Sequence, residues 1–123
     1  MDGNILLVDD DVSILLLVSD VLEENGMNVV TARSGEEAVR LMEGQSFDLI
    51  LLDIKMPEMN GIDALKEIRK FDQDIPIIMQ SAYAFENDME AARQAGSNGF
   101  VTKPINIKEL KSVLSSFLPQ LTW

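Results

Sequence analysis

Cysteine and histidine are both absent from the sequence, and their absence excludes several classes of chemistry. Without cysteine, the chain forms no disulfide, no thiolate zinc site and no cysteine nucleophile. Without histidine, it has no imidazole ligand for a metal ion and no histidine base to activate a serine nucleophile. A bound metal ion would therefore be coordinated by oxygen atoms, which favours Mg²⁺, Ca²⁺ or Mn²⁺.

Basic residues are also few. The chain has 10 lysine and arginine residues against 21 aspartate and glutamate residues, which gives a net charge of −11. Nucleic acids and anionic membranes bind basic surfaces, so we expect neither as a partner. The chain also lacks an apolar run of about 18 residues and a signal-peptide pattern, so we expect a soluble, cytoplasmic protein without a transmembrane segment.

Glycine and proline are infrequent, with 7 and 4 residues respectively, whereas 46% of the residues are hydrophobic. This composition favours an ordered core, and we expect one domain that spans residues 1–123. Short apolar segments alternate with helical patterns along the whole chain. The segments predicted as strands are 4–9, 27–32, 47–53, 75–80 and 99–102. Such alternation is typical of a parallel sheet covered on both faces, so we predict a three-layer (βα)₅ domain of the α/β class.

Polar residues suited to helix capping precede several of the predicted helices. Ser34 and Asn106 each begin a capping box with glutamate three residues later, and Asn60 can cap the helix after the central strand. Asp11 can cap the first helix in the same way. The pattern does not determine the order of the strands, although the order 2-1-3-4-5 would place the first and third strands side by side.

Chemically active side chains lie at the ends of four of the five predicted strands. They are Asp9, Asp10 and Asp11 at the first strand, Asp53 at the third, Ser81 after the fourth and Lys103 after the fifth. Taken singly, each has a simpler explanation, as a helix cap, a turn residue or an exposed loop lysine. Because the carboxyl ends of parallel strands lie along one edge of the sheet, however, we expect all of them in one crevice.

Together these residue types indicate phosphoryl transfer. Several carboxylates in one crevice repel one another unless a divalent cation binds between them. A lysine and a hydroxyl supply hydrogen-bond donors for phosphoryl oxygens. Asp53 is the single carboxylate at the end of the central apolar strand, and an aspartate can attack phosphorus to form an acyl phosphate. The sequence therefore predicts a cation, a nucleophile and two donors at one edge of the sheet.

Four segments of the chain carry a resemblance to a known family: LLVDDD at 6–11, LLDIKMPEMNG at 51–61, PIIMQSAYA at 76–84 and GFVTKP at 99–104. Together they resemble the receiver domain of two-component response regulators, over the whole length of the chain. The resemblance implies a flavodoxin-like fold with a parallel sheet of order 2-1-3-4-5. It also implies that Asp53 accepts a phosphoryl group from the phosphohistidine of a histidine kinase or a histidine phosphotransfer protein.

The resemblance further implies a role for each residue of the cluster. The ligands of Mg²⁺, or alternatively of Mn²⁺, would be Asp9, Asp10, Asp53 and the backbone carbonyl of Lys55. Ser81 and Lys103 would contact the phosphoryl oxygens. Such a domain catalyses its own phosphorylation and dephosphorylation, but it is not a dedicated enzyme.

Ser81 and Phe100 match the two positions through which receivers change the binding of partners. Ser81 stands where threonine is more frequent, and it keeps the hydroxyl group. Phe100 stands where tyrosine is frequent, so it offers no hydroxyl group to a partner whose binding depends on one. Ala82 would leave the space that the aromatic ring needs to turn inward.

Lys55 and Tyr83 lie two residues after Asp53 and Ser81, so their side chains are expected to flank the mouth of the site. Neither side chain offers a carboxylate or an amide that could orient an attacking water molecule. We therefore predict slow loss of the phosphoryl group. The alternative is that both are exposed loop side chains without an effect on this rate.

Several alternatives stay open at this point. The receiver could be a single-domain regulator or part of a hybrid histidine kinase. Only residues 118–123 follow the last predicted helix, so the signal is expected to leave by contact, from a monomer or from a dimer formed on phosphorylation. In another class, Asp9-x-Asp11 resembles the opening motif of haloacid dehalogenase phosphatases, although no glycine and threonine follow it. A receiver that is never phosphorylated and only binds proteins is a third reading.

Overall fold

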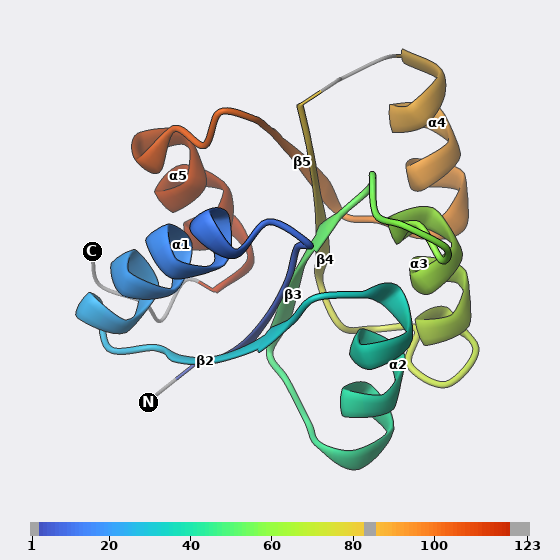
Figure 1. Ribbon diagram of the computed structural model, residues 1–123, viewed down its shortest axis with the longest axis horizontal. Helices are drawn as coiled ribbons and strands as arrows, with labels where there is room; N and C mark the ends of the chain where they lie inside the picture. Colours follow the sequence, from blue (N-terminus) through green and yellow to red (C-terminus); the bar gives the residue numbers. More distant parts are fainter. Residues whose placement is uncertain (1–2, 83–85, 119–123) are drawn as a thin grey trace.

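Strands and helices alternate along the part of the chain that the computed structural model describes, residues 3–82 and 86–118 (Figure 1). The strands are β1 (Asn4–Val8), β2 (Asn28–Ala32), β3 (Leu49–Asp53), β4 (Ile77–Ser81) and β5 (Gly99–Thr102). The helices are α1 (Val12–Glu24), α2 (Gly35–Gly44), α3 (Gly61–Arg69), α4 (Glu86–Ala95) and α5 (Ile107–Phe117). The predicted alternation is confirmed.

The strands form one parallel sheet in the order β2-β1-β3-β4-β5. Helices α1 and α5 cover one face, and α2, α3 and α4 cover the other, so the domain has three layers (Figure 1). This is the predicted flavodoxin-like order and architecture. Strand β3 lies in the centre of the sheet, and all of its residues are buried.

The side chains of β3 show how the sheet divides the core in two. Leu49 and Leu51 pack with the buried residues of α1 and α5, whereas Ile50 and Leu52 pack with those of α2, α3 and α4. Because side chains alternate between the faces of a strand, Asp53 extends on the same side as Leu51. The apolar strand therefore ends in a buried carboxylate on the face of the sheet that α1 and α5 cover.

All four predicted helix caps are present. The side chains of Ser34, Asn60 and Asn106 each accept a hydrogen bond from the backbone N–H three residues later, at 3.1, 2.9 and 3.1 Å. Asp11 accepts from the N–H of Ser13 at 2.9 Å. A cap of this kind stabilises a helix by about 1 kcal/mol, since it satisfies a backbone donor that has no partner inside the helix.

Some element bounds differ from those predicted. The strand predicted over 75–80 is β4, Ile77–Ser81, because Pro76 has no N–H group to donate to a neighbouring strand. At the other end, β4 extends one residue further than predicted, so Ser81 is the last residue of the strand instead of the first residue after it. The strand predicted over 47–53 begins at Leu49. None of the helices in the described ranges is both long and apolar enough to cross a membrane.

Candidate metal and phosphoryl site

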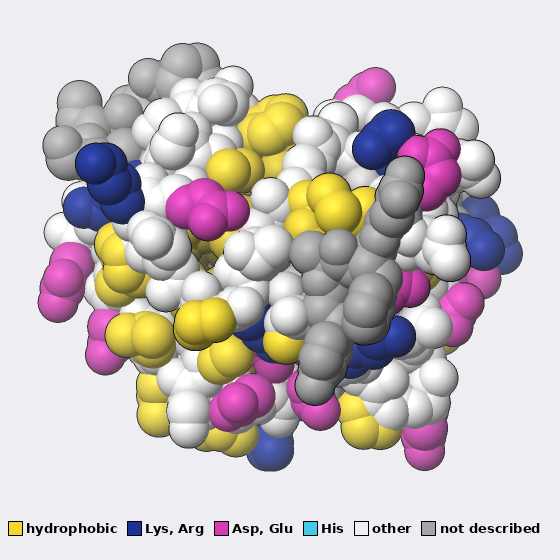
Figure 2. Space-filling view, turned by 90° about the horizontal axis from the view of Figure 1, so that it is seen from above, with side chains coloured by type: hydrophobic (Ala, Val, Ile, Leu, Met, Phe, Trp, Pro, Cys, Tyr) yellow, Lys and Arg dark blue, Asp and Glu magenta, His cyan; other side chains and the backbone are white. Residues whose placement is uncertain are grey.

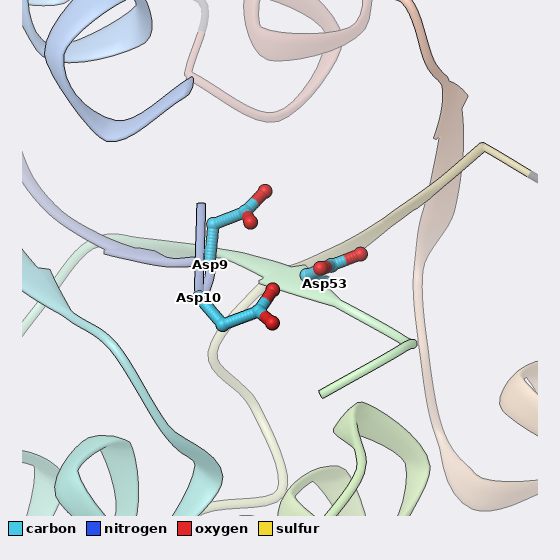
Figure 3. A group of neighbouring side chains, drawn as sticks. All are labelled: Asp9, Asp10 and Asp53. Carbon is cyan, nitrogen blue, oxygen red and sulfur yellow. The ribbon is translucent and has the colours of Figure 1, made fainter. Parts of the chain in front are cut away.

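Three carboxylates meet where β1 and β3 end. Asp9 and Asp10 follow β1, Asp53 is the last residue of β3, and these strands are neighbours in the sheet. One carboxylate oxygen from each lies within 4.8 Å of the others (Figure 3). Asp9 and Asp53 are buried, with 0% and 2% of their surface exposed, while Asp10 is exposed to solvent. The cluster therefore has two buried carboxylates and one at its mouth.

Lys103 supplies the positive charge of the site. Its ammonium Nζ lies 2.7 Å from Oδ2 of Asp9 and 3.2 Å from Oδ2 of Asp53, and only 13% of the side chain is exposed. The backbone N–H of Lys103 donates to the carbonyl of Ser81 at 2.9 Å, which ties the end of β5 to the end of β4. Burial favours the neutral amine, but contacts with Asp9 and Asp53 outweigh it and raise the pKa of Lys103. Lys103 is therefore an ammonium ion that bridges the two buried carboxylates.

The charges of this cluster do not balance. Burial, and then the neighbouring charge of Asp9, raise the pKa of Asp53 from 3.8 to about 6, although Lys103 acts in the opposite direction. One ammonium ion thus compensates only part of the negative charge of two buried carboxylates and a third at the mouth. A divalent cation, or another group that neutralises charge, would therefore stabilise this cluster.

The carboxylate of Asp9 is held by further hydrogen bonds. The backbone N–H of Asp11 donates to Oδ1 at 2.9 Å, and the side-chain amide Nε2 of Gln80 donates to Oδ2 at 3.2 Å. Gln80 was not predicted as a site residue. A signal for it exists in the sequence, because it is a polar residue within the otherwise apolar run IPIIMQ at 75–80.

Comparison with known proteins identifies the family of this site. The family model described as the response regulator receiver domain matches residues 5–115. The chain belongs to the response regulator receiver family. This receiver is 40% identical over 121 residues to the transcriptional regulatory protein CpxR of Escherichia coli K12, a match that covers 98% of the chain and 51% of CpxR. The chain spans about half the length of the curated relatives it matches.

Solved structures agree with this assignment. The receiver domain of the sensor histidine kinase PA1611 from Pseudomonas aeruginosa, which has a magnesium ion coordinated in its active-site cleft, superposes with a TM-score of 0.89. The two are 33% identical, over 97% of this chain and 99% of that one. The chemotaxis protein CheY4 of Vibrio cholerae superposes with a TM-score of 0.91 at 30% identity, over 95% and 99% of the two chains.

The donor set of the receiver fits a hard divalent cation. The group formed by Asp9, Asp10 and Asp53 offers only carboxylate oxygens, which are the ligands that Mg²⁺ and Mn²⁺ prefer. Asp11 does not belong to this group: its side chain caps α1, as the sequence suggested. The receiver family and the capping role of Asp11 together overturn the haloacid dehalogenase reading of Asp9-x-Asp11.

Gly61 has a role at the site that its place in the motif did not reveal. A Cβ atom at this position would lie 2.0 Å from the backbone carbonyl oxygen of Asp53, so no residue with a side chain fits there. The N–H of Gly61 also donates to the carbonyl of Ile54 at 2.8 Å. The first turn of α3 can therefore pack directly against the end of β3.

The remaining predicted residues of the receiver differ in where they lie. Ser81 is buried at the end of β4, the strand next to β3, and Ala82 is exposed. The side chain of Lys55 is 60% exposed, and its Nζ lies 3.7 Å from Oδ2 of Asp88 in α4. Phe100 packs against the core on the opposite face of the sheet and lines a hollow of about 240 Å³ between α4 and β5. Tyr83 lies outside the described residues.

Proposed function

We propose that this receiver accepts a phosphoryl group on Asp53 from the phosphohistidine of a histidine kinase or a histidine phosphotransfer protein. The observation that carries the proposal is the buried Asp53 carboxylate, which lies 3.2 Å from the Lys103 ammonium and within 4.8 Å of oxygens of Asp9 and Asp10. A nucleophile beside a fixed cation and a divalent-ion site is the arrangement that phosphoryl transfer requires.

In the proposed reaction, an oxygen of Asp53 attacks phosphorus as the bond from phosphorus to the imidazole nitrogen breaks. The attacking carboxylate must be ionised, which its pKa of about 6 allows at neutral pH. The ammonium of Lys103 moves toward a phosphoryl oxygen, and the hydroxyl of Ser81 donates to another. Mg²⁺, when bound, neutralises negative charge on the attacking and phosphoryl oxygens. The product is an acyl phosphate on Asp53.

The ligands proposed for Mg²⁺ are Asp9, Asp10, Asp53 and the backbone carbonyl of Lys55, and Mn²⁺ would use the same oxygen donors. In the loss of the phosphoryl group, water attacks phosphorus as the bond from phosphorus to the Asp53 oxygen breaks, which restores the Asp53 carboxylate and releases inorganic phosphate. The receiver would thus catalyse only reactions of its own aspartate and would not be a dedicated enzyme. We propose the cytoplasm as the location of this activity.

The proposed signal leaves through a change in partner binding. When the Ser81 hydroxyl moves to the phosphoryl group, Phe100 is proposed to turn inward past Ala82. Phe100 lines the hollow between α4 and β5, so a change in the position of its ring would alter this part of the surface. The partner binds a monomer, or a dimer that forms on phosphorylation.

Helix α1 offers a surface for the phosphodonor. Large apolar side chains are exposed on this helix, which begins two residues after Asp10: Val12 at 45%, Leu16 at 62% and Leu17 at 52%. Hydrophobic side chains among acidic ones are also visible on the face of the molecule seen in Figure 2. Grouped exposed apolar residues are typical of protein–protein contacts. They support a protein donor, which must bring its phosphohistidine to Asp53.

The test uses acetyl phosphate and Mg²⁺ as donor and cofactor, with intact-mass spectrometry as the readout. Wild type should gain one phosphoryl group, and Asp53→Asn should gain none. Asp11→Asn is the matched control, because asparagine also caps a helix and Asp11 lies outside the carboxylate cluster; it should be labelled like wild type. Peptide mapping that placed the label on Asp9 or Asp10, or a wild type without label, would contradict the proposal.

A further inference from the structure

Gln80 is a buried polar residue in a position where packing alone favours an apolar one. None of its surface is exposed, and it lies in β4 opposite Asp53 of β3 and Val101 of β5. Its amide Nε2 donates a hydrogen bond of 3.2 Å to Oδ2 of Asp9, which follows β1 on the far side of β3. The side chain therefore extends across the central strand to the acidic cluster.

The other half of this amide lacks a partner among the described residues. The carbonyl oxygen Oε1 of Gln80 is buried and accepts no hydrogen bond within the described part of the chain. A buried acceptor without a partner costs free energy, because it has lost its hydrogen bonds to water. Methionine has nearly the same length and would fill this strand position without that cost. The contact with Asp9 is what the glutamine adds.

The same oxygen of Asp9 has a second, stronger partner. Lys103 Nζ lies 2.7 Å from Oδ2 of Asp9, and it also lies 3.2 Å from Oδ2 of Asp53. Without a cation, Oδ2 of Asp9 is thus held by Lys103 and Gln80 together, while Oδ1 accepts from the backbone N–H of Asp11. A divalent cation beside Asp9 would repel the ammonium, and a phosphoryl group on Asp53 would attract it. Both would draw Lys103 away from Asp9.

We infer that Gln80 is a positioning residue that holds the Asp9 carboxylate for the divalent cation when Lys103 leaves it. The inference rests on the proposed function, which supplies the cation and the phosphoryl group. After Lys103 has moved, the Gln80 amide is the side-chain donor that stays on Oδ2 of Asp9. Loss of this donor therefore weakens the loaded state more than the empty one, in which Lys103 still compensates. Donors that orient a metal ligand typically contribute 10–100-fold to metal affinity.

The test compares Gln80→Met with wild type and with Met79→Leu. Gln80→Met keeps the length and burial of the side chain but removes the donor. Met79 is the matched control, since it is equally buried in the same strand but packs with the core on the opposite face. Calorimetric titration with MgCl₂, without a phosphodonor, should give a Kd about tenfold higher for Gln80→Met and an unchanged Kd for Met79→Leu.

Phosphorylation by acetyl phosphate supplies a second readout. For Gln80→Met, the Mg²⁺ concentration that gives half of the maximal rate should rise by the same factor of about ten, while the rate at saturating Mg²⁺ changes less than about threefold. A merely structural residue would not produce this split. If far-ultraviolet circular dichroism shows that Gln80→Met is unfolded, Gln80→Leu replaces it in both measurements.

The outcomes separate this inference from the proposed function. A wild-type Kd for Mg²⁺ in the folded Gln80 variant would overturn the role of Gln80, even if Asp53 of the wild type is phosphorylated. A phosphorylation rate reduced by the same factor at every Mg²⁺ concentration would also overturn it. A tenfold weaker Mg²⁺ affinity in a receiver that takes up no phosphoryl group would support the role of Gln80 and contradict the proposed function.

Discussion

The two ends of the sheet both hold charged side chains, half-buried at one end and buried at the other, and they compensate the charge in different ways. At the end where β4 begins, the guanidinium of Arg69 donates to the backbone carbonyl of Gly96 at 2.8 and 3.1 Å, to that of Asp72 at 3.2 Å and to Oδ1 of Asn98 at 2.9 Å. Asn98 Oδ1 also accepts from the N–H of Ile77 at 2.9 Å. Here the acceptors of the one cation are neutral amide oxygens that join α3, the loop before β5, and β4, while the nearby charges of Asp72 and Asp74 favour the charged guanidinium.

At the opposite end, carboxylates crowd around one ammonium ion. Asp9 and Asp53 are both within 3.2 Å of Lys103, and Asp10 lies at the mouth. The negative charge exceeds the positive charge, so this end of the sheet costs stability until a cation binds. Hydrogen bonds thus stabilise the fold at one end of the sheet, whereas carboxylates repel one another at the other end.

The largest effect is expected at the stabilising end. Arg69→Ala removes the donor of the Gly96 and Asp72 carbonyls and one of the two donors of Asn98 Oδ1, so it should lower the free energy of unfolding by about 3 kcal/mol. Lys66→Ala is the matched control, because it removes an exposed charge from the same last turn of α3 and should change stability by less than about 0.5 kcal/mol. Urea unfolding measures both. Mg²⁺ affinity should be unchanged in both, and a change in Arg69→Ala would show that the two ends are coupled.

The next effect concerns the pH dependence of the metal-free fold. The pKa of Asp53 is raised from 3.8 to about 6, so the folded state holds this proton more tightly than the unfolded chain does. The resulting stability is present below about pH 4 and is lost as the pH rises through about 6. Asp53→Asn has no charge at this position and avoids this loss of stability. Its free energy of unfolding should exceed that of wild type by on the order of 2 kcal/mol at neutral pH and should match it near pH 4. An equal difference at both pH values would contradict the assignment.

Cation binding should recover part of the cost at the acidic end. For a site with a Kd of roughly 1 mM, about 10 mM Mg²⁺ adds about 1.4 kcal/mol to the free energy of unfolding. Asp10→Ala should raise the stability without Mg²⁺ and remove this increment. Asp20→Ala, at an exposed position of α1 outside the cluster, should keep it. Equal Mg²⁺ responses in wild type and Asp10→Ala would leave no cation site at these residues.

The smallest effect concerns the lifetime of the phosphoryl group. Lys55→Asn combined with Tyr83→Glu replaces the two side chains that the sequence predicts to flank the site and adds groups that can orient water. The double variant should lose phosphoryl roughly threefold faster than wild type, which corresponds to less than 1 kcal/mol of barrier. Lys66→Asn, another exposed lysine, should leave the rate unchanged. Decay of the double variant at the wild-type rate would show that these side chains do not shield the acyl phosphate.

Local features of the fold could be predicted because they depend on nearby residues. The helix caps at Ser34, Asn60 and Asn106 formed as expected, since a cap needs only a side chain and an N–H group three residues away. The acidic cluster could also be predicted, although its members are distant in the chain. Parallel strands separated by helices must end on the same edge, so residues at those ends meet whatever the details of packing.

Contacts across strands could not be predicted in the same way. The run IPIIMQ shows that Gln80 is polar, but the contact with Asp9 depends on strand order, register and the direction of both side chains. Arg69 reads as a charged residue near the end of a helix, and its acceptors at Gly96 and Asn98 come from a loop far along the chain. The need for glycine at position 61 likewise becomes clear only from the close packing of α3 against the end of β3.

The sequence was therefore sufficient for the class of fold, the capped helix starts and the gathering of Asp9, Asp10, Asp53 and Lys103 at one edge. These follow from hydrophobic period, local hydrogen bonding and the geometry of parallel strands, none of which requires exact packing. Which oxygen of Asp9 receives Lys103 and Gln80, and how much the pKa of Asp53 rises, were decided by the folded structure. Distances of 2.7 and 3.2 Å and the degree of burial arise only when side chains from separate strands pack together, because electrostatic free energy depends on both.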